Sequence, residues 1–286
     1  THPRLAFVVA LATALLVQHG EPLSINGTEL WVHRKGEGRG PAVVVVHGGP
    51  MLDHGYLVEW LSPLADTHER VFYDQRLNGR STANVPAERV RVSPGVGDSW
   101  GAHPALKYAL ARPDHLHSLM LLDPMAPSAE QWQQEQAAQG AAMSAEAMAK
   151  IQELRSAPGV TEGDPTAIEA LLRATFRTQF VEPDRADDLA LYVPDDYLAR
   201  SRQMGVMMAD LSNFDLRPAL PTLAVPTLLL YGDAESGVEI GGASLHEGIP
   251  ESRLVIIEEA GHFPFIERPE AFLAAVRGFL AEVSER

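Results

Sequence analysis

The sequence of 286 residues contains no cysteine and few cations, and both shortages exclude classes of function. Without cysteine there is no disulfide framework, no thiol nucleophile and no cysteine-ligated metal. The 23 Lys and Arg residues are outnumbered by 38 Asp and Glu residues, which gives a formal net charge of -15. No stretch gathers the cations into a surface that would neutralise phosphates, so nucleic acid is not an expected partner. The sequence instead favours a small-molecule or short-peptide substrate.

Long hydrophobic runs are scarce, and the clearest one lies at the start of the chain. Leu5 to Val17 is apolar except for Thr13 and follows Arg4, so residues 1–20 resemble a secretory signal. The run is too short for a stable membrane span. A secreted or periplasmic location is therefore expected. The alternative is a cytoplasmic protein in which this segment is a buried helix or strand.

Apolar runs and helical patterns alternate along the rest of the chain. Val43 to Val46 is a continuous β-branched run, typical of a strand covered on both faces. Further runs occur at 71–73, 118–122, 227–231 and 253–257, and helical patterns at 56–65, 105–111 and 269–283. Residues 22–35 indicate a hairpin that turns at Asn26-Gly27. The alternation predicts an α/β protein with a mostly parallel, doubly wound sheet.

Between Pro124 and about Ala219 the alternation stops, and the segment is rich in Ala, Gln, Met and Glu at helical spacing. We interpret 124–219 as a helical cap inserted into a core made of 21–123 and 220–286. The acids of the cap are candidates for binding an ammonium group, although a charge run is usually a solvated face. They are Glu182, Asp184, Asp187, Asp188, Asp195 and Asp196. The sequence leaves the oligomeric state open.

The motif Gly97-Asp98-Ser99-Trp100-Gly101 fits G-x-S-x-G, a sharp strand-to-helix turn that raises a serine hydroxyl above a sheet. A helical pattern follows at once, so its amides would face a developing oxyanion. Ser99 is therefore the candidate nucleophile. A serine at this position argues against chemistry that needs a carboxylate nucleophile.

A serine hydroxyl needs a base and an acid that orients the base. His262 supplies the base from a loop between the last strand pattern and the last helical pattern. Two acids compete in the loop after residues 227–231, Asp233 and Glu235. We favour Glu235, because Asp233 is placed to be held by local amides in an Asx-type turn.

The oxyanion of an acyl-transfer reaction also needs backbone donors. The string His47-Gly48-Gly49-Pro50 follows a predicted central strand, and its glycines allow close approach to a substrate. We assign the two donors to the amides of Gly49 and Trp100. No HExxH or comparable histidine spacing is present, so neither a metal nor another cofactor is expected.

With these residues identified, the sequence resembles the proline iminopeptidase branch of the α/β-hydrolases. HGGP at His47, FYDQRLNGRS at 72–81, GDSWG at Gly97 and AGHFPFIE at Ala260 carry the resemblance in order. It implies an α/β-hydrolase fold and release of N-terminal residues, often proline, from short peptides. It also implies that cap carboxylates hold the substrate's amino group and that the DQR segment is architectural.

The chain departs from that branch at several positions. Leu77 stands where glycine is common, Glu235 where aspartate is usual, and Pro104 enters the first turns of the helix after Ser99. The interval from Arg80 to Gly97 is also short for a helix and the strand before the nucleophile. Only residues 89–93 show strand-like alternation there.

Three functions are consistent with these features. The first is a serine aminopeptidase of the prolyl type that works through an acyl-enzyme. The second is a carboxylesterase, lactonase or amidase acting on small acyl substrates. The third is a catalytically inactive binding protein on the same fold, since a fold does not by itself imply a function.

Overall fold

A computed structural model describes residues 20–285, with the exception of 26, 37–41, 50 and 82–95. Three features of the sequence therefore lie outside the described residues. They are residues 1–19 of the apolar N-terminal segment, Asn26 of the predicted turn, and the strand-like stretch at 89–93.

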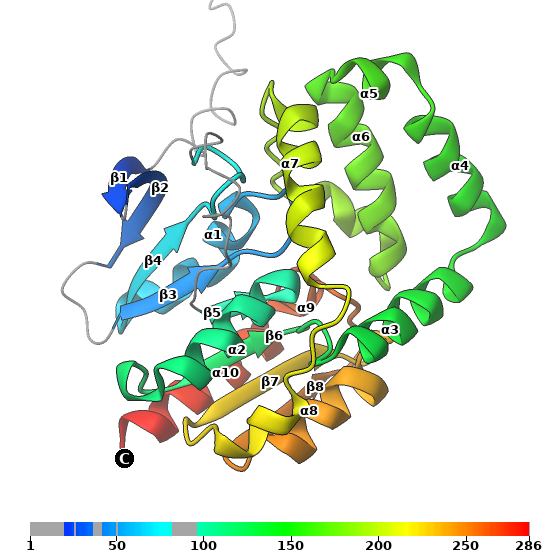
Figure 1. Ribbon diagram of the computed structural model, residues 1–286. Helices are drawn as coiled ribbons and strands as arrows, with labels where there is room; N and C mark the ends of the chain where they lie inside the picture. Colours follow the sequence, from blue (N-terminus) through cyan, green and yellow to red (C-terminus); the bar gives the residue numbers. More distant parts are fainter. Residues whose placement is uncertain (1–19, 26, 37–41, 50, 82–95, 286) are drawn as a thin grey trace, which may run out of the picture.

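Within the described residues, the strands form one sheet in the order β1-β2-β4-β3-β5-β6-β7-β8 (Figure 1). β1 and β2 are an antiparallel hairpin, β2 pairs antiparallel with β4, and the other neighbours are parallel. The predicted mostly parallel sheet is confirmed. The bounds are β1 Glu21–Ile25, β2 Thr28–Lys35, β3 Ala42–Val46, β4 Glu69–Tyr73, β5 Val96–Asp98, β6 Leu119–Leu122, β7 Thr227–Gly232 and β8 Ser252–Ile257.

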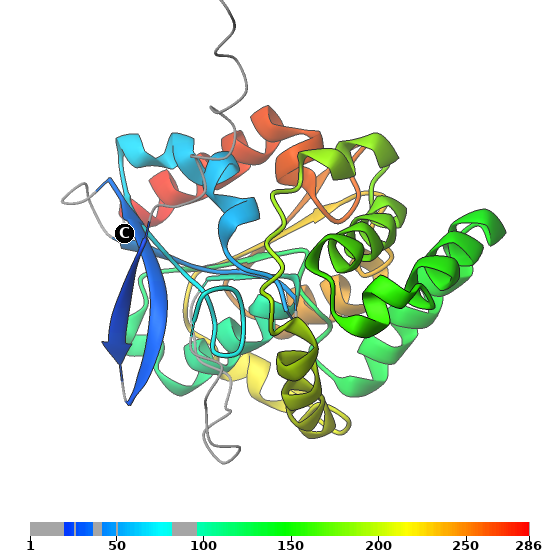
Figure 2. The same ribbon diagram turned by 90° about the horizontal axis from the view of Figure 1, so that it is seen from above.

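Helices cover both faces of this sheet, as Figure 2 shows for α1 and α10 on one side and α2 and α8 on the other. These helices and the short α9 that precedes α10 belong to the core of the fold. Their bounds are α1 Gly55–Leu61, α2 Ala102–Ala111, α8 Ala243–Gly248, α9 Pro264–Glu267 and α10 Pro269–Ser284.

The two faces of the central strands explain why their sequences are apolar without alternation. Leu228 and Leu230 of β7 pack in the cluster beneath α1 and α10, whereas Leu229 packs in the cluster beneath α2 and α8. All three are fully buried. Complete burial of one such side chain stabilises the fold by about 1.5–3 kcal/mol. A continuous hydrophobic run is therefore the pattern that a doubly covered strand requires.

The segment read as the cap contains α3 Ala129–Ala142, α4 Ala145–Arg155, α5 Pro158–Glu162, α6 Pro165–Phe176 and α7 Tyr197–Asp210. Polar side chains begin three of these helices by accepting a first-turn amide. Ser128 accepts from Gln131, Ser144 from Ala147, and Asp164 from Ala167. Such caps satisfy amides that have no partner inside the helix. These helices are therefore defined by local sequence as well as by packing.

Candidate active site

The candidate site lies where loops leave neighbouring strands of the sheet. Ser99 follows β5, Glu235 follows β7 and His262 follows β8, and these strands lie in the sheet order β5-β6-β7-β8. The carboxyl ends of parallel strands meet at one edge of a sheet, which is where ligands bind in open α/β folds. Ser99 and His262, which are 163 positions apart in sequence, are thus brought to one edge of the sheet.

Ser99 lies on a strained turn between β5 and the short 3₁₀ helix Ser99–Gly101 that leads into α2. Its φ is 50°, in the left-handed region that non-glycine residues rarely adopt. Glycine is required on both sides of it. A Cβ on Gly97 would collide with the Gly101 carbonyl, and a Cβ on Gly101 would lie 2.5 Å from the carbonyl oxygen of His47. The turn therefore has the geometry of a nucleophile elbow.

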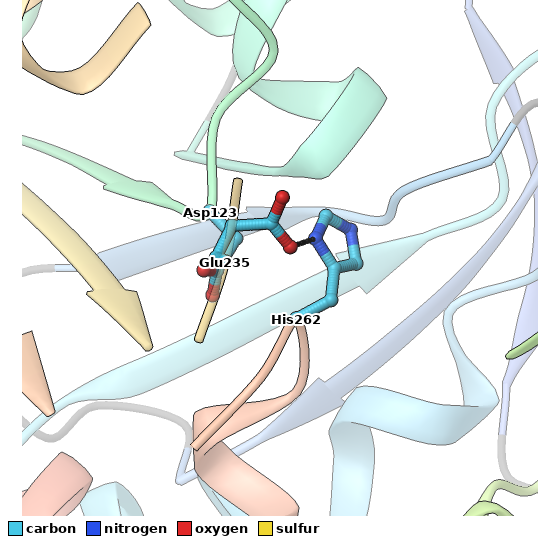
Figure 3. A group of neighbouring side chains, drawn as sticks. All are labelled: Asp123, Glu235 and His262. Carbon is cyan, nitrogen blue, oxygen red and sulfur yellow. Dashed lines mark hydrogen bonds and ion pairs between the residues drawn. The ribbon is translucent and has the colours of Figure 1, made fainter. Parts of the chain in front are cut away.

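His262 is hydrogen-bonded to one of the two acids considered from the sequence. Its Nδ1 lies 2.8 Å from Oε2 of Glu235, and the second ring nitrogen points away from the acids (Figure 3). Asp233 is used differently, because its Oδ1 accepts the amide of Ala260 at 3.1 Å. The structure thus brings together His262 and Glu235 and leaves Asp233 as a support of the loop that carries His262.

Charge around His262 favours the protonated imidazole. Burial alone would lower the pKa of His262, but the carboxylates of Glu235, Asp123 and Asp98 raise it to about 9. For Glu235, burial opposes ionisation, yet the neighbouring imidazole holds the pKa of its carboxyl below the usual range. The pair is therefore suited to stabilise an imidazolium, the form that a general base adopts after it accepts a proton.

The loop that carries His262 is anchored to the cap. The amide of His262 donates to the carbonyl of Gln179 at 2.8 Å. The buried carboxylate of Glu267 accepts the amide of Gly261 at 2.7 Å and that of Glu182 at 3.0 Å. Glu267 thus bridges the histidine loop and the cap. This arrangement fixes the imidazole relative to the residues that cover the site.

Ser99 and His262 line the same cavity of about 230 Å³. Among the described residues, no hydrogen bond joins the hydroxyl of Ser99 to the ring of His262. Catalytic hydrogen bonds often tighten only when substrate binds. Gly49 and Trp100, the two predicted oxyanion donors, also line this cavity.

The cap supplies much of the opposite wall of the cavity. The cap residues at the wall are mainly aromatic or carboxamide side chains, namely Trp132, Gln136, Gln139, Phe176 and Gln179. Glu135 of α3 is the cap acid at this wall, and its two oxygens accept the amides of Ala126 and Gly241, each at 3.1 Å. Burial raises the pKa of Glu135 to about 7. Its bonds tie α3 to the core next to the site.

The cap acids that were candidates for binding an ammonium group lie elsewhere, and none of them lines the cavity of Ser99. Most form ion pairs with arginine at the protein surface. Asp184 and Asp187 pair with Arg177, Asp188 with Arg185, Asp196 with Arg200, and Glu182 with Arg268. Each of these acids thus lies within ion-pair distance of an arginine, with Arg177 shared by Asp184 and Asp187, apart from Asp195, for which no ion pair occurs among the described residues.

A buried tyrosine that was not predicted from the sequence links the loop of Gly48 and Gly49, here called the glycine loop, to the turn at Asp98 and Ser99, here called the nucleophile turn. The hydroxyl of Tyr56 accepts the amide of Gly48 at 2.6 Å and donates to Oδ2 of Asp98 at 2.5 Å. Burial raises the pKa of Asp98 to about 6. No local pattern marks Tyr56, because its partners are 8 and 42 residues away in the sequence.

The turn after β4 supports the same glycine loop. The amide of Gln75 donates to Nε2 of His47, and the Gln75 side chain donates to the carbonyl of His47 at 2.7 Å. Asp74 is fully buried and accepts the amide of His54 at 3.0 Å and that of Arg80 at 2.7 Å. These bonds agree with the supporting role expected for Asp74 and Gln75.

A third acid, Asp123, lies beside the pair formed by Glu235 and His262. One ligand atom from each of these three residues lies within 4.8 Å of the others. Figure 3 shows the three side chains converging from separate segments. The sequence analysis missed Asp123, although its position directly after an apolar run is a signal that it shares with the other site residues. The cluster has the residue types of a metal site, but Nδ1 of His262 already faces Glu235.

Among the described helices, none combines the length and apolar character that a membrane crossing needs.

Comparison with known proteins identifies relatives of two kinds. A family described as the alpha/beta hydrolase fold matches residues 95–269. A proline iminopeptidase of Heyndrickxia coagulans is 24% identical over 277 residues, covering 86% of this chain and 92% of the relative. A pimeloyl-[acyl-carrier protein] methyl ester esterase of Aeromonas salmonicida (strain A449) is 26% identical over 276 residues, covering 85% and 96%.

Among solved structures, the proline iminopeptidase of Mycobacterium smegmatis is similar with a TM-score of 0.65 and 21% identity. The match covers 92% of this chain and 98% of that one. At this identity the likeness concerns the fold.

Proposed function

Because the chain belongs to the alpha/beta hydrolase family, we propose that it is a serine hydrolase with Ser99 as nucleophile, His262 as general base and Glu235 as orienting acid. The proposal includes an acyl-enzyme intermediate and a small ester or amide substrate.

One observation carries the proposal. A serine on a left-handed elbow shares a cavity with an imidazole whose other nitrogen is bonded to a partly buried carboxylate. Nucleophile, base and orienting acid are the three parts that acyl transfer needs, and such sets are recognised by geometry and roles.

The reaction follows from these positions. Oγ of Ser99 attacks the substrate carbonyl carbon, and its proton passes to Nε2 of His262. The imidazolium then gives this proton to the leaving alcohol or amine as the bond to the acyl carbon breaks. Water attacks the acyl-serine, His262 takes a proton from that water, and the proton returns to Oγ of Ser99. Glu235 stabilises the imidazolium in both halves.

The negative oxygen formed in each attack needs donors, and we propose the amides of Gly49 and Trp100 for this role. Both residues line the cavity next to Ser99. A Cβ on Gly48 would lie 3.2 Å from Cβ of Ser99, so the glycine loop approaches the nucleophile closely. Loss of one donor from a comparable site lowers the rate by about 100- to 1000-fold.

Two substrate classes follow from the relatives, and the cavity favours an ester. An aminopeptidase needs an unmatched carboxylate for the substrate's ammonium, but most of the cap acids pair with arginines away from the cavity. Glu135 at the cavity wall is bonded to two backbone amides. The aminopeptidase stays the second candidate, because the proline iminopeptidase relative is matched over nearly its whole length.

Labelling with an active-serine phosphonate tests the hydrolase proposal without knowledge of the substrate. We expect covalent modification of wild-type protein at Ser99, seen as a mass increase on the peptide that contains this residue. Ser99→Ala and His262→Ala are expected to abolish it. A folded wild-type protein that is not labelled would contradict the proposal and favour a binding protein.

Substrate class is tested by comparing turnover of a short acyl ester with that of a prolyl arylamide. We expect the ester to have the higher kcat/KM by at least tenfold. Preferential cleavage of the arylamide would refute the ester assignment and establish the aminopeptidase. Ser99→Ala is the control that excludes hydrolysis by a contaminant.

A further inference from the structure

Asp123 lies at the carboxyl end of a strand, as do the catalytic candidates Ser99 and Glu235. It directly follows β6, which lies between β5 and β7 in the sheet. Its φ is 40°, and its amide donates to the carbonyl of Leu230 in β7 at 2.8 Å. The backbone therefore holds this side chain in an uncommon conformation, fixed against the strand that leads to Glu235.

The carboxyl group of Asp123 is buried, and only one of its two oxygens accepts a hydrogen bond from a described residue. Oδ1 accepts the amide of Gly232 at 3.2 Å, whereas Oδ2 is buried and has no hydrogen-bond partner among the described residues. The residue is 3% exposed. An unpartnered buried carboxyl oxygen is unfavourable, so its retention next to a functional pair calls for an explanation.

The surroundings of Asp123 contain acids and one imidazole. Asp98 faces it from the end of β5, Glu235 and Tyr231 from the β7 segment, and His262 from the loop after β8. The hydroxyl of Tyr231 is directed to the carbonyl of Pro124 at 3.3 Å. Burial, together with the charges of Glu235 and Asp98, raises the pKa of Asp123 well above its usual range. The charge of Glu235 therefore opposes ionisation of Asp123.

We propose that Asp123 is a reserve orienting acid for His262, able to pair with the imidazolium when Glu235 does not. This inference rests on the proposed function. In the wild-type protein Glu235 provides the charge next to Nδ1 of His262, and this charge opposes ionisation of Asp123. When the carboxylate of Glu235 is absent, Asp123 releases its proton to solvent and becomes the anion that faces His262.

The proposal predicts non-additive effects of two substitutions. Glu235→Ala removes the first acid and opens the space between Asp123 and His262. Asp123→Asn keeps the acceptor for the Gly232 amide and removes the ability to carry charge. The rate of phosphonate labelling at Ser99 reports the activity of the base without any assumption about the substrate.

We expect Glu235→Ala to slow labelling by about 10- to 100-fold, less than the roughly 10⁴-fold that loss of an orienting acid causes elsewhere. Adding Asp123→Asn should bring the loss to about 10⁴-fold. The factor by which Asp123→Asn slows labelling should be at least ten times larger in the Glu235→Ala background than in the wild-type background.

The pH profile separates this role from a structural one. In Glu235→Ala, the acidic limb of the labelling rate, which reports deprotonation of His262, should lie at a higher pH than in the double variant, because the charge of Asp123 raises the pKa of His262. The matched control is Glu153→Gln in the same background, which removes an exposed acid of α4 paired with Lys150 and should not shift the limb. Thermal unfolding of each variant verifies folding, and Glu235→Gln replaces the alanine variant if that one is unfolded.

Equal labelling rates for Glu235→Ala and the double variant, or identical pH profiles, would overturn the reserve role while leaving the hydrolase proposal intact. Absence of labelling in the wild type would instead refute the hydrolase, and the reserve role with it.

Discussion

Replacement of Tyr56 by phenylalanine tests whether the glycine loop and the nucleophile turn are held by one hydroxyl. Tyr56 is 2% exposed, and its hydroxyl bonds both the Gly48 amide and Asp98. Because Oδ1 of Asp98 already lacks a partner among the described residues, the variant leaves this buried carboxyl without one. An unsatisfied buried group costs about 1–3 kcal/mol. With two groups affected, we expect the free energy of unfolding to fall by about 2–6 kcal/mol.

Urea unfolding measures this difference, with an unchanged m-value showing that the folded and unfolded states expose comparable surface. Tyr108→Phe is the matched control, because its hydroxyl contacts His115 at the protein surface. Its effect should stay within about 0.5 kcal/mol. The reasoning is refuted if Tyr56→Phe is no more destabilising than Tyr108→Phe. Slower phosphonate labelling of folded Tyr56→Phe would show that the link also positions Ser99.

Three further predictions concern the base, the elbow and a strained core residue. Since the base must be neutral and its surroundings raise the pKa of His262 to about 9, kcat/KM should increase with pH from 6.5 through about 9 and level off only above that value. An acidic limb at or below 6.5 contradicts this. Gly101→Ala places a Cβ 2.5 Å from a backbone oxygen and should markedly lower the melting temperature and abolish labelling, whereas Gly140→Ala, with nothing within 4 Å, should be neutral or stabilise α3 by up to about 1 kcal/mol. Leu77→Gly removes the strain of a side chain at a φ of 68°, which is worth about 1–2 kcal/mol. It also removes a fully buried side chain, which costs about 2–5 kcal/mol, so chemical denaturation should show a net loss of stability.

The main strands were predictable because a strand that is buried on both faces has a continuous run of hydrophobic residues. Every residue of β7 is buried, and its predicted run at 227–231 differs from the observed strand by one residue. The helix after Ser99 was predicted from 105 but begins at Ala102. Pro104 is tolerated there because the first turn of a helix has amides without internal partners.

Part of the candidate site was predictable from the order of segments along the chain. The order of a serine, an acid and a histidine along the chain is the one expected for this fold, so the sequence predicts that Ser99, Glu235 and His262 act together. Tyr56 and Asp123 were missed for a different reason. Their importance lies in contacts between distant segments, and neither belongs to a motif with fixed spacing.

The position of Ser99 depends more on close backbone contacts of the two flanking glycines than on strand pairing. β5 has three residues and pairs with β3 at two positions and with β6 at two positions. So short a ladder leaves the direction of the chain weakly defined. The close contacts of Gly97 with Gly101 and of Gly101 with the backbone of His47 supply the missing restraint. A substitution at either glycine should therefore disturb the nucleophile more than one elsewhere in β5, because these contacts hold the elbow against neighbouring backbone.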